Sequence, residues 1–355
     1  MHDTTYSRPL TFEPMRFRRR LLHVLQRGMA LSGMGAAYVR RRGVDGAVIL
    51  MYHGITDKED ANWIDPRFAV PVTVFERQMR FLAKNRNVIA LQELLSLIKA
   101  GNSPPPGSVV ITFDDGYRSV FTKAAPILKR YQLPATLYLA TGQVSRVEAQ
   151  WIDRLYSMFN TRSRDFLETT GEKLGSANLD NPLEARSAYY ALAEQLLPAS
   201  REQREKILGG IADALRPLRQ PPPLTLTWEE IRQMRRLYPG IEIGVHTRDH
   251  IDLTACEPQD AAAEVAMSAA DVQRELDIAP AHFSFPYGRS NPAARHAVIA
   301  ANLSSAAVTE PAVLVRAGGD PYALPRLSAP SNMALFPFYT SGAYPQASLE
   351  VFGRA

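Results

Sequence analysis

Cysteine is nearly absent from this sequence, since Cys256 is the only one among 355 residues. An intrachain disulfide is therefore impossible, and a reducing compartment fits this composition. The sequence also lacks an internal repeat and an apolar run long enough to span a bilayer. With 46% hydrophobic and 22% charged residues, it has the composition of a globular protein with a sizeable core. That length allows one large elaborated domain or two domains.

Positive charge is concentrated at the beginning of the chain, and without that segment the net charge of +5 would be near zero. The basic character therefore predicts no nucleic-acid partner for the main body. Residues 21–39 are fairly apolar, but His23 and Arg27 interrupt them, which makes a poor signal peptide. We interpret residues 1–46 as a basic N-terminal helical extension, with peripheral contact with an anionic membrane surface as the alternative. We expect a cytoplasmic protein, with peripheral association with the inner membrane as the alternative.

From residue 47 onward, strand-like and helix-like segments alternate, which predicts a parallel sheet or barrel. The domain is expected over residues 47–330. The expected strands are residues 47–52, 88–90, 109–113, 135–140, 241–245, 281–285 and 305–308. The expected helices are residues 74–82, 91–99, 120–131, 257–276 and 292–301, with a further helix opening at the Thr227–Glu230 capping box.

This alternation breaks over residues 145–222, which carry a helical pattern and no strong strand. We interpret them as an α-helical insertion, most simply a packing or lid subdomain without chemistry. Trp151 and Asp153 within it are best explained as a core residue and a helix cap, the alternative being that they reach the site from the insertion. Residues 331–355 show no clear element and are expected to form a C-terminal tail.

Polar residues fall at the ends of several expected strands. His53, Asp114–Asp115, His246 and Tyr287 each lie at, or just past, the carboxyl end of one. In an α/β barrel these ends share one face, and that face carries the active site. Segments far apart in the sequence are therefore expected to meet there.

Two adjacent carboxylates after a buried strand repel each other and are costly to desolvate, and a cation offsets that cost. Asp115, His246 and His250 form a two-histidine, one-carboxylate set, which leaves positions open for water and substrate. The i, i+4 spacing predicts that both imidazoles lie on one side of a helical turn. Together these segments point to a metal-dependent hydrolase.

The same residues resemble the polysaccharide deacetylase family, also called carbohydrate esterase family 4 or the NodB homology domain. Thr112–Gly116 (TFDDG) matches its first motif, His246–His250 (HTRDH) its second, and Phe285–Gly288 (FPYG) the end of its third. The resemblance covers roughly residues 47–330 without the insertion. It implies a distorted (β/α) barrel.

The resemblance also implies a role for each matching residue. Asp114 would be the general base, and Asp115, His246 and His250 would bind a divalent metal, usually zinc and in some relatives cobalt, nickel or manganese. The backbone N–H of Tyr287 would stabilise the oxyanion. These roles agree with the chemistry, because a metal lowers the pKa of a water that a nearby carboxylate can then deprotonate.

Two positions depart from the family pattern. Ser284 stands where the family has the arginine that orients the base, and Arg326 stands in the region of the late histidine motif. A subgroup associated with exopolysaccharide clusters shares these features and an early Tyr-His, which Tyr52-His53 resembles. We hypothesise that Arg326 orients Asp114 or the substrate. His53 would contact substrate or act as the acid, the alternative being a structural histidine.

The expected activity is removal of acetyl groups from N-acetylated sugars in a polysaccharide or glycan precursor. An amidohydrolase of the same fold acting on a non-sugar amide is one alternative. A catalytically inactive glycan-binding relative is another, although it would not need the aspartate and histidine set. The sequence leaves open the sugar, the chain length, the preference for N- or O-acetyl groups and the oligomeric state.

Overall fold

A computed structural model describes residues 46–168, 176–309 and 314–342. Within these residues, seven parallel strands form a closed barrel in the order β1-β12-β11-β10-β9-β6-β5, and pairing of β5 with β1 closes the ring. The strands are β1 (Val48–Tyr52), β5 (Ser108–Phe113), β6 (Ala135–Leu139), β9 (Ile241–Val245), β10 (His282–Ser284), β11 (Ser305–Val308) and β12 (Leu324–Ser328). A two-residue strand, β4 (Asn87–Val88), pairs with the start of β5. The expected distorted (β/α) barrel is confirmed.

Burial on both faces explains why β1, β5 and β6 are largely continuous apolar runs rather than alternating ones. All six residues of β5 are buried. In the register that closes the barrel, Tyr52 pairs with Phe113, so the residues that follow β1 and β5 emerge side by side. The backbone N–H of Asp114 extends this pairing by donating to the Tyr52 carbonyl at 2.9 Å.

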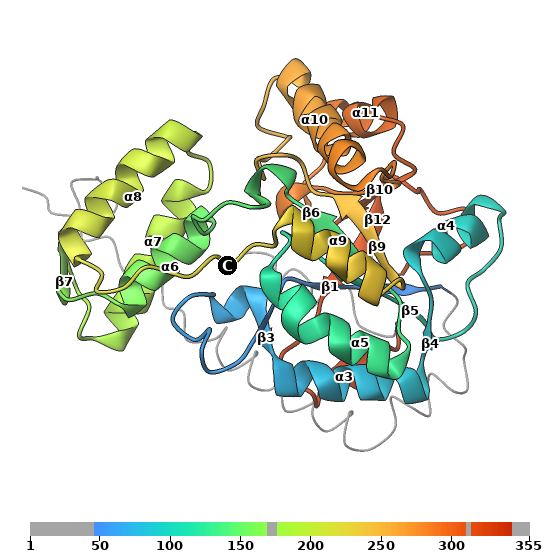
Figure 1. Ribbon diagram of the computed structural model, residues 1–355, viewed down its shortest axis with the longest axis horizontal. Coiled ribbons are helices and arrows are strands. Elements are labelled where there is room, and N and C mark those ends of the chain that lie inside the picture. Colours follow the sequence, from blue (N-terminus) through green and yellow to red (C-terminus); the bar gives the residue numbers. More distant parts are fainter. Residues whose placement is uncertain (1–45, 169–175, 310–313, 343–355) are drawn as a thin grey trace, which may run out of the picture.

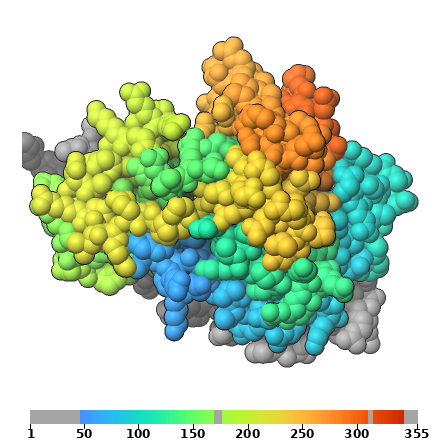
Figure 2. Space-filling model, viewed as in Figure 1, coloured from blue at the N-terminus to red at the C-terminus, as the bar shows by residue number. Residues whose placement is uncertain are grey.

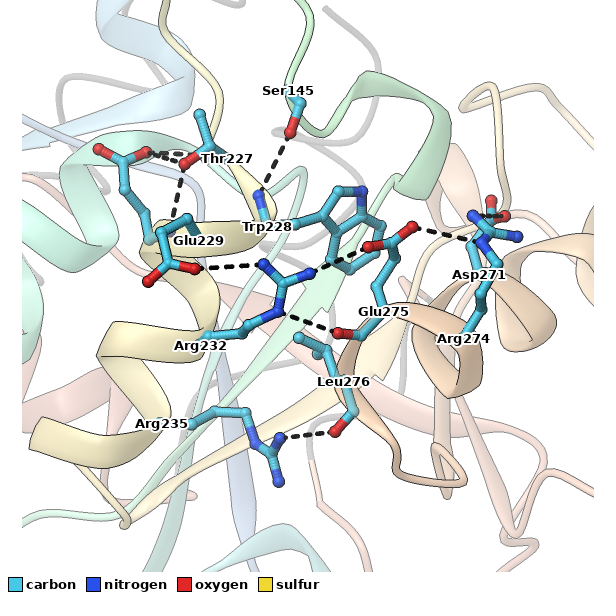
Figure 3. Close-up of polar contacts among 11 residues, drawn as sticks. Ser145, Thr227, Trp228, Glu229, Arg232, Arg235, Asp271, Arg274, Glu275 and Leu276 are labelled. Atoms are coloured by element: carbon cyan, nitrogen blue, oxygen red, sulfur yellow. Dashed lines mark hydrogen bonds and ion pairs between the residues drawn. The ribbon is translucent and has the colours of Figure 1, made fainter.

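Helices surround the barrel (Figure 1). They are α3 (Val72–Asn85), α4 (Leu91–Lys99), α5 (Ala125–Tyr131) after a π-helical turn (Val120–Ala124), α9 (Trp228–Leu237), α10 (Pro258–Leu276) and α11 (Pro292–Ala300). Arginines of α9 fasten it to the end of α10 (Figure 3): Arg232 donates to the Glu275 carbonyl at 3.2 Å and Arg235 to the Leu276 carbonyl at 3.0 Å. These bonds satisfy carbonyls that the end of α10 leaves without a helical partner.

The insertion stands to one side of the barrel as a separate lobe (Figures 1 and 2). Its helices are α6 (Trp151–Asn160), α7 (Pro182–Leu196) and α8 (Arg201–Leu215). Leu155, Leu192 and Leu208, one from each helix, belong to a hydrophobic cluster distinct from the barrel core. The insertion also contains a short antiparallel hairpin of β7 (Phe166–Glu168) and β8 (Ser176–Asn178), which the sequence did not predict.

Three other parts differ from expectation. β12 was not predicted, and neither were the short paired strands β2 (Gly54–Thr56) and β3 (Ala69–Pro71). A short helix, α12 (Phe336–Tyr339), forms where no element was expected, and Phe336 joins the barrel core.

Two further expectations concern the N-terminal extension and membrane-spanning segments. The predicted N-terminal extension lies outside the described residues, apart from its last one. Among the helices that are described, none combines the length and hydropathy needed to cross a bilayer.

Candidate metal centre and its acid–base residues

The structure brings the predicted ligands together. Suitable ligand atoms of Asp115, His246 and His250 all lie within 4.8 Å of one another. Asp115 Oδ1 is 3.2 Å from His250 Nε2 and 3.6 Å from His246 Nε2. Asp115 and His246 are buried, and the His250 side chain is 15% exposed.

The protonation of these side chains fits a bound cation. His246 Nδ1 lies 2.6 Å from the Ser284 carbonyl, which can only accept, so this nitrogen carries the proton. Burial lowers the pKa of His246 to about 4, so the ring is neutral and turns the lone pair of Nε2 toward Asp115. Asp115 Oδ1 is itself buried and receives no hydrogen bond of acceptable geometry from the described residues. Acceptors that converge in this way are satisfied by a cation, and imidazole with carboxylate suits zinc.

The histidine motif is not the helical turn that its spacing predicted. Residues 246–250 form a non-helical loop in which Thr247 and His250 have φ values of 62° and 54°. Glu264 of α10 shapes this loop, because its carboxylate accepts the backbone N–H groups of Arg248 (3.0 Å) and Asp249 (2.9 Å). Nothing in the sequence distinguishes Glu264 from the other acidic residues of α10, so sequence reasoning missed it.

Asp114 lies beside this cluster and is held by Arg326. The guanidinium donates to both carboxylate oxygens at 2.7 Å, in the bidentate geometry typical of strong arginine–carboxylate pairs. It also donates to Ser284 Oγ at 2.7 Å and to Thr112 Oγ1 at 3.2 Å. Burial raises the pKa of Asp114, but the charge and hydrogen bonds of Arg326 lower it, and the pKa lies below its usual value. Asp114 is therefore an ionised carboxylate at neutral pH.

Ser284 explains how a guanidinium from β12 can reach Asp114. Its short side chain lies at the end of β10, where the family pattern has an arginine, and its hydroxyl contacts the Arg326 guanidinium. Arg326 is 1% exposed and lies over the Tyr138 ring at 5.4 Å. Side chains of three other strands, β5, β6 and β10, thus surround this buried guanidinium group.

His53 and Tyr287 complete the set of predicted residues. His53 is half-buried, its ring lies 5.8 Å from that of Phe68, and its proximity helps to lower the pKa values of Asp114 and Asp115. The Tyr287 ring packs edge-on against His250 with centroids 5.0 Å apart. All the predicted site residues therefore lie at one end of the barrel.

Strained backbone conformations occur at this end of the barrel. Asp115, His250 and Tyr287 have φ values of 71°, 54° and 57°, and left-handed non-glycine residues of this kind cost about 1–3 kcal/mol each. Gly288 follows Tyr287 with φ 67°, and a Cβ there would lie 2.2 Å from Thr309 Oγ1. Such conformations persist only where tertiary contacts impose them, which is typical of functional sites.

The metal-free protein is expected to lose stability as the pH falls from about 6.5 toward about 4. Unfolded His246 takes up a proton in this range, whereas the folded residue, with its pKa lowered by burial to about 4, does not. The contribution of His246 to this loss is on the order of 3 kcal/mol at 1.36 kcal/mol per pKa unit. Melting temperatures of chelator-treated protein between pH 7.5 and 4.5 measure it.

His282 makes a second contribution to this pH dependence, because burial lowers its pKa to about 4 as well. His246→Gln should remove one of the two contributions and make the pH dependence shallower. An identical slope in wild type and variant would contradict the assignment of a neutral His246.

Comparisons with known proteins agree with this geometry. The family described as polysaccharide deacetylase matches residues 101–306. A poly-beta-1,6-N-acetyl-D-glucosamine N-deacetylase from Staphylococcus aureus is 30% identical over 125 residues, which are 35% of this chain and 41% of the relative. A putative polysaccharide deacetylase from Bacillus subtilis is 33% identical over 92 residues, 26% of this chain and 30% of the relative. The chain thus spans about two fifths or less of the length of these curated relatives.

Solved structures share the fold. IcaB from Ammonifex degensii aligns with a TM-score of 0.54 at 20% identity, covering 84% of this chain and 97% of that one. The Streptococcus pyogenes deacetylase PplD, solved in complex with acetate, also gives 0.54, at 18% identity, covering 82% and 95%. Because the family match extends over more than half of the residues, this chain belongs to the polysaccharide deacetylase family.

Proposed function

We propose that this protein removes acetyl groups from N-acetylated sugars of a polysaccharide or glycan precursor, and that the reaction depends on a divalent metal. The observation that carries the proposal is that an ionised carboxylate lies beside the candidate metal centre. Asp114 Oδ2 is 4.0 Å from His246 Nε2, one of the proposed metal ligands. A glycan-binding protein needs no such pair of groups. The named relative from Staphylococcus aureus supports an N-acetylglucosamine polymer as the substrate class.

Asp115, His246 and His250 would hold the metal, for which zinc is our first choice and cobalt, nickel or manganese the alternatives. When bound, such an ion lowers the pKa of water and polarises the acetyl carbonyl. Asp114 is the proposed base. Although Arg326 occupies one lone-pair direction on each of its oxygens, each oxygen keeps another that can accept a proton from the attacking water.

The remaining steps fall to groups on the same end of the barrel. Water adds to the acetyl carbon, and the backbone N–H of Tyr287 is proposed to donate to the carbonyl oxygen as it becomes negative. The C–N bond then breaks, and the amine nitrogen takes a proton, for which half-buried His53 is the proposed donor. The products are acetate and a free amino sugar.

Acetate release from a substrate panel tests this proposal. The panel contains poly-beta-1,6-N-acetyl-D-glucosamine, chitooligosaccharides, O-acetylated glycans and small linear and cyclic non-sugar amides. We expect release from the N-acetylated glycans. Release from the non-sugar amides alone would contradict the sugar substrate and favour an amidohydrolase, and glycan binding without any release would favour a binding protein.

His53→Ala tests the acid role directly. If His53 protonates the leaving amine, kcat should fall by roughly 10²- to 10⁴-fold, and the limb of the pH–rate profile at high pH should change because that limb reports the acid. The measurement is kcat and kcat/KM against pH for both proteins. An unchanged rate and an unchanged basic limb would make His53 a structural residue.

A further inference from the structure

The segment that directly follows the two aspartates, Gly116–Arg118, is held both by residues just after the helical insertion and by a residue near its start. Just after the insertion, the Arg118 N–H donates to the Leu224 carbonyl at 2.7 Å and the Leu226 N–H donates to the Gly116 carbonyl at 2.9 Å. These bonds form an antiparallel bridge centred on Tyr117 and Thr225. The insertion is thus attached to the turn that carries Asp115, and not only to the outside of the barrel.

Where the insertion begins, a buried carboxyl group contacts the same segment. The Tyr117 hydroxyl donates to Asp153 Oδ2 at 2.9 Å, and both residues are at most 1% exposed. Asp153 does not cap α6 as the sequence suggested, because the N-cap is Gln150 and Asp153 lies inside the first turn. The other oxygen of Asp153 has no hydrogen-bond partner among the described residues.

A buried carboxyl with one unpartnered oxygen is destabilising, so packing alone does not account for it. Burial raises the pKa of Asp153 well above its usual value, and the group is a neutral carboxylic acid at neutral pH. The insertion also has its own hydrophobic cluster. The polar contact to Tyr117 therefore adds a directional restraint that the apolar contacts do not provide.

The turn at Asp115 and Gly116, to which this restraint applies, has a backbone conformation that depends on surrounding contacts. Asp115 and Gly116 are consecutive residues with positive φ values of 71° and 75°. Such a turn is maintained by surrounding contacts rather than by local preference. The same first turn of α6 also reaches the third motif: Trp151 lies near the Tyr287 hydroxyl, and Arg204 of α8 lies over the indole at 4.9 Å.

We propose that Asp153 is a positioning residue, which acts through Tyr117 to fix the turn that presents Asp115 and so couples the helical insertion to the metal ligands. The inference rests on the proposed function only for the identity of those ligands. It changes the interpretation of the insertion, from a lobe without chemistry to part of the support of the site.

Zinc affinity tests this coupling, measured by competition with a chromophoric chelator well below the melting temperature. Tyr117→Phe keeps the ring and removes the hydroxyl, and we expect zinc affinity to fall about 10-fold or more, as is usual when a group supporting a ligand is lost. Asp153→Ala should have the same effect, and the double variant should be no worse than either single one. Asp153→Asn should stay close to wild type, because an amide resembles the neutral acid.

Tyr189→Phe is the matched control. Tyr189 of α7 donates to Asp65 Oδ2 at 2.7 Å, which is another buried tyrosine–aspartate bond between the insertion and the barrel, but one that does not touch residues 116–118. This variant should keep wild-type zinc affinity even if its melting temperature falls. Equal losses in Tyr189→Phe and Tyr117→Phe, or wild-type affinity in folded Tyr117→Phe, would overturn the inference.

The readout separates this inference from the proposed function. If wild type binds zinc but releases no acetate from any glycan, the proposed function fails and the affinity comparison still decides the role of Asp153. If wild type releases acetate and Tyr117→Phe binds zinc normally, only the inference fails. If wild type binds no zinc or other divalent metal, both fail.

Discussion

Asp114→Asn is expected to lower kcat by roughly 10²- to 10⁴-fold, the range that a positioned general base contributes. The carboxylate is buried, ionised and held through both oxygens by Arg326, so no other orientation is open to it. An amide in its place cannot accept the proton of water. The measurement is the steady-state rate of acetate release, together with the metal content of the purified variant.

Asp115→Asn is the matched control, because it changes the adjacent carboxylate in the same way. We expect Asp114→Asn to retain metal and lose rate, whereas Asp115→Asn should lose both, since Asp115 is the residue 3.2 Å from His250 Nε2. If Asp114→Asn kept most of its activity, Asp114 would not be the base. If it lost metal as completely as Asp115→Asn, the division of roles between the two aspartates would be wrong.

Arg326→Met is expected to destabilise the fold by about 3–5 kcal/mol, the usual loss when one partner of a buried ion pair is removed. Arg326 is 1% exposed and supplies the charge that lowers the pKa of Asp114 against the effect of burial. Without it, burial raises the pKa of Asp114, so a larger fraction of the base is protonated at any given pH. Activity should therefore fall at neutral pH, and the acidic limb of the rate profile should move to higher pH.

Two further variants separate charge from packing. Ser284→Ala removes one hydrogen bond from the guanidinium and leaves both contacts to Asp114, so the acidic limb should stay in place. The double variant Asp114→Asn/Arg326→Met should recover stability relative to Arg326→Met, because no buried charge remains unpaired, yet stay inactive. Chemical denaturation and pH–rate profiles measure these effects. An unshifted acidic limb in Arg326→Met would contradict the role of Arg326 in holding Asp114 ionised.

The strands that carry the site were predictable where they are mostly apolar and buried. β9 and β11 lie at the residues expected, and β5 begins one residue earlier than expected, because buried parallel strands are continuous hydrophobic runs. β12 escaped prediction for a physical reason. It contains Pro325, which cannot donate to a ladder, and Arg326, whose charge normally signals solvent exposure.

Polar contacts between segments far apart in the sequence could not be predicted from sequence patterns. The spacing of His246 and His250 predicted a helical turn, but Glu264, anchored on α10, binds the loop amides and imposes a different backbone. Asp153 was assigned to a cap because a carboxylate near the start of a helix usually has that role, and its contact with Tyr117 depends on the packing of α6. Each of these errors concerns a polar side chain whose partner lies more than ten residues away.

Metal-dependent acetate release tests the central claim most directly. Protein stripped with a chelator, and the same protein reloaded with zinc, would be assayed on poly-beta-1,6-N-acetyl-D-glucosamine, with metal content determined in parallel. The structure predicts one metal ion per chain at Asp115, His246 and His250, negligible release by the stripped protein and restored release after reloading. Full activity of the stripped protein, or no acetate from any acetylated glycan after reloading with any of the candidate metals, would contradict it.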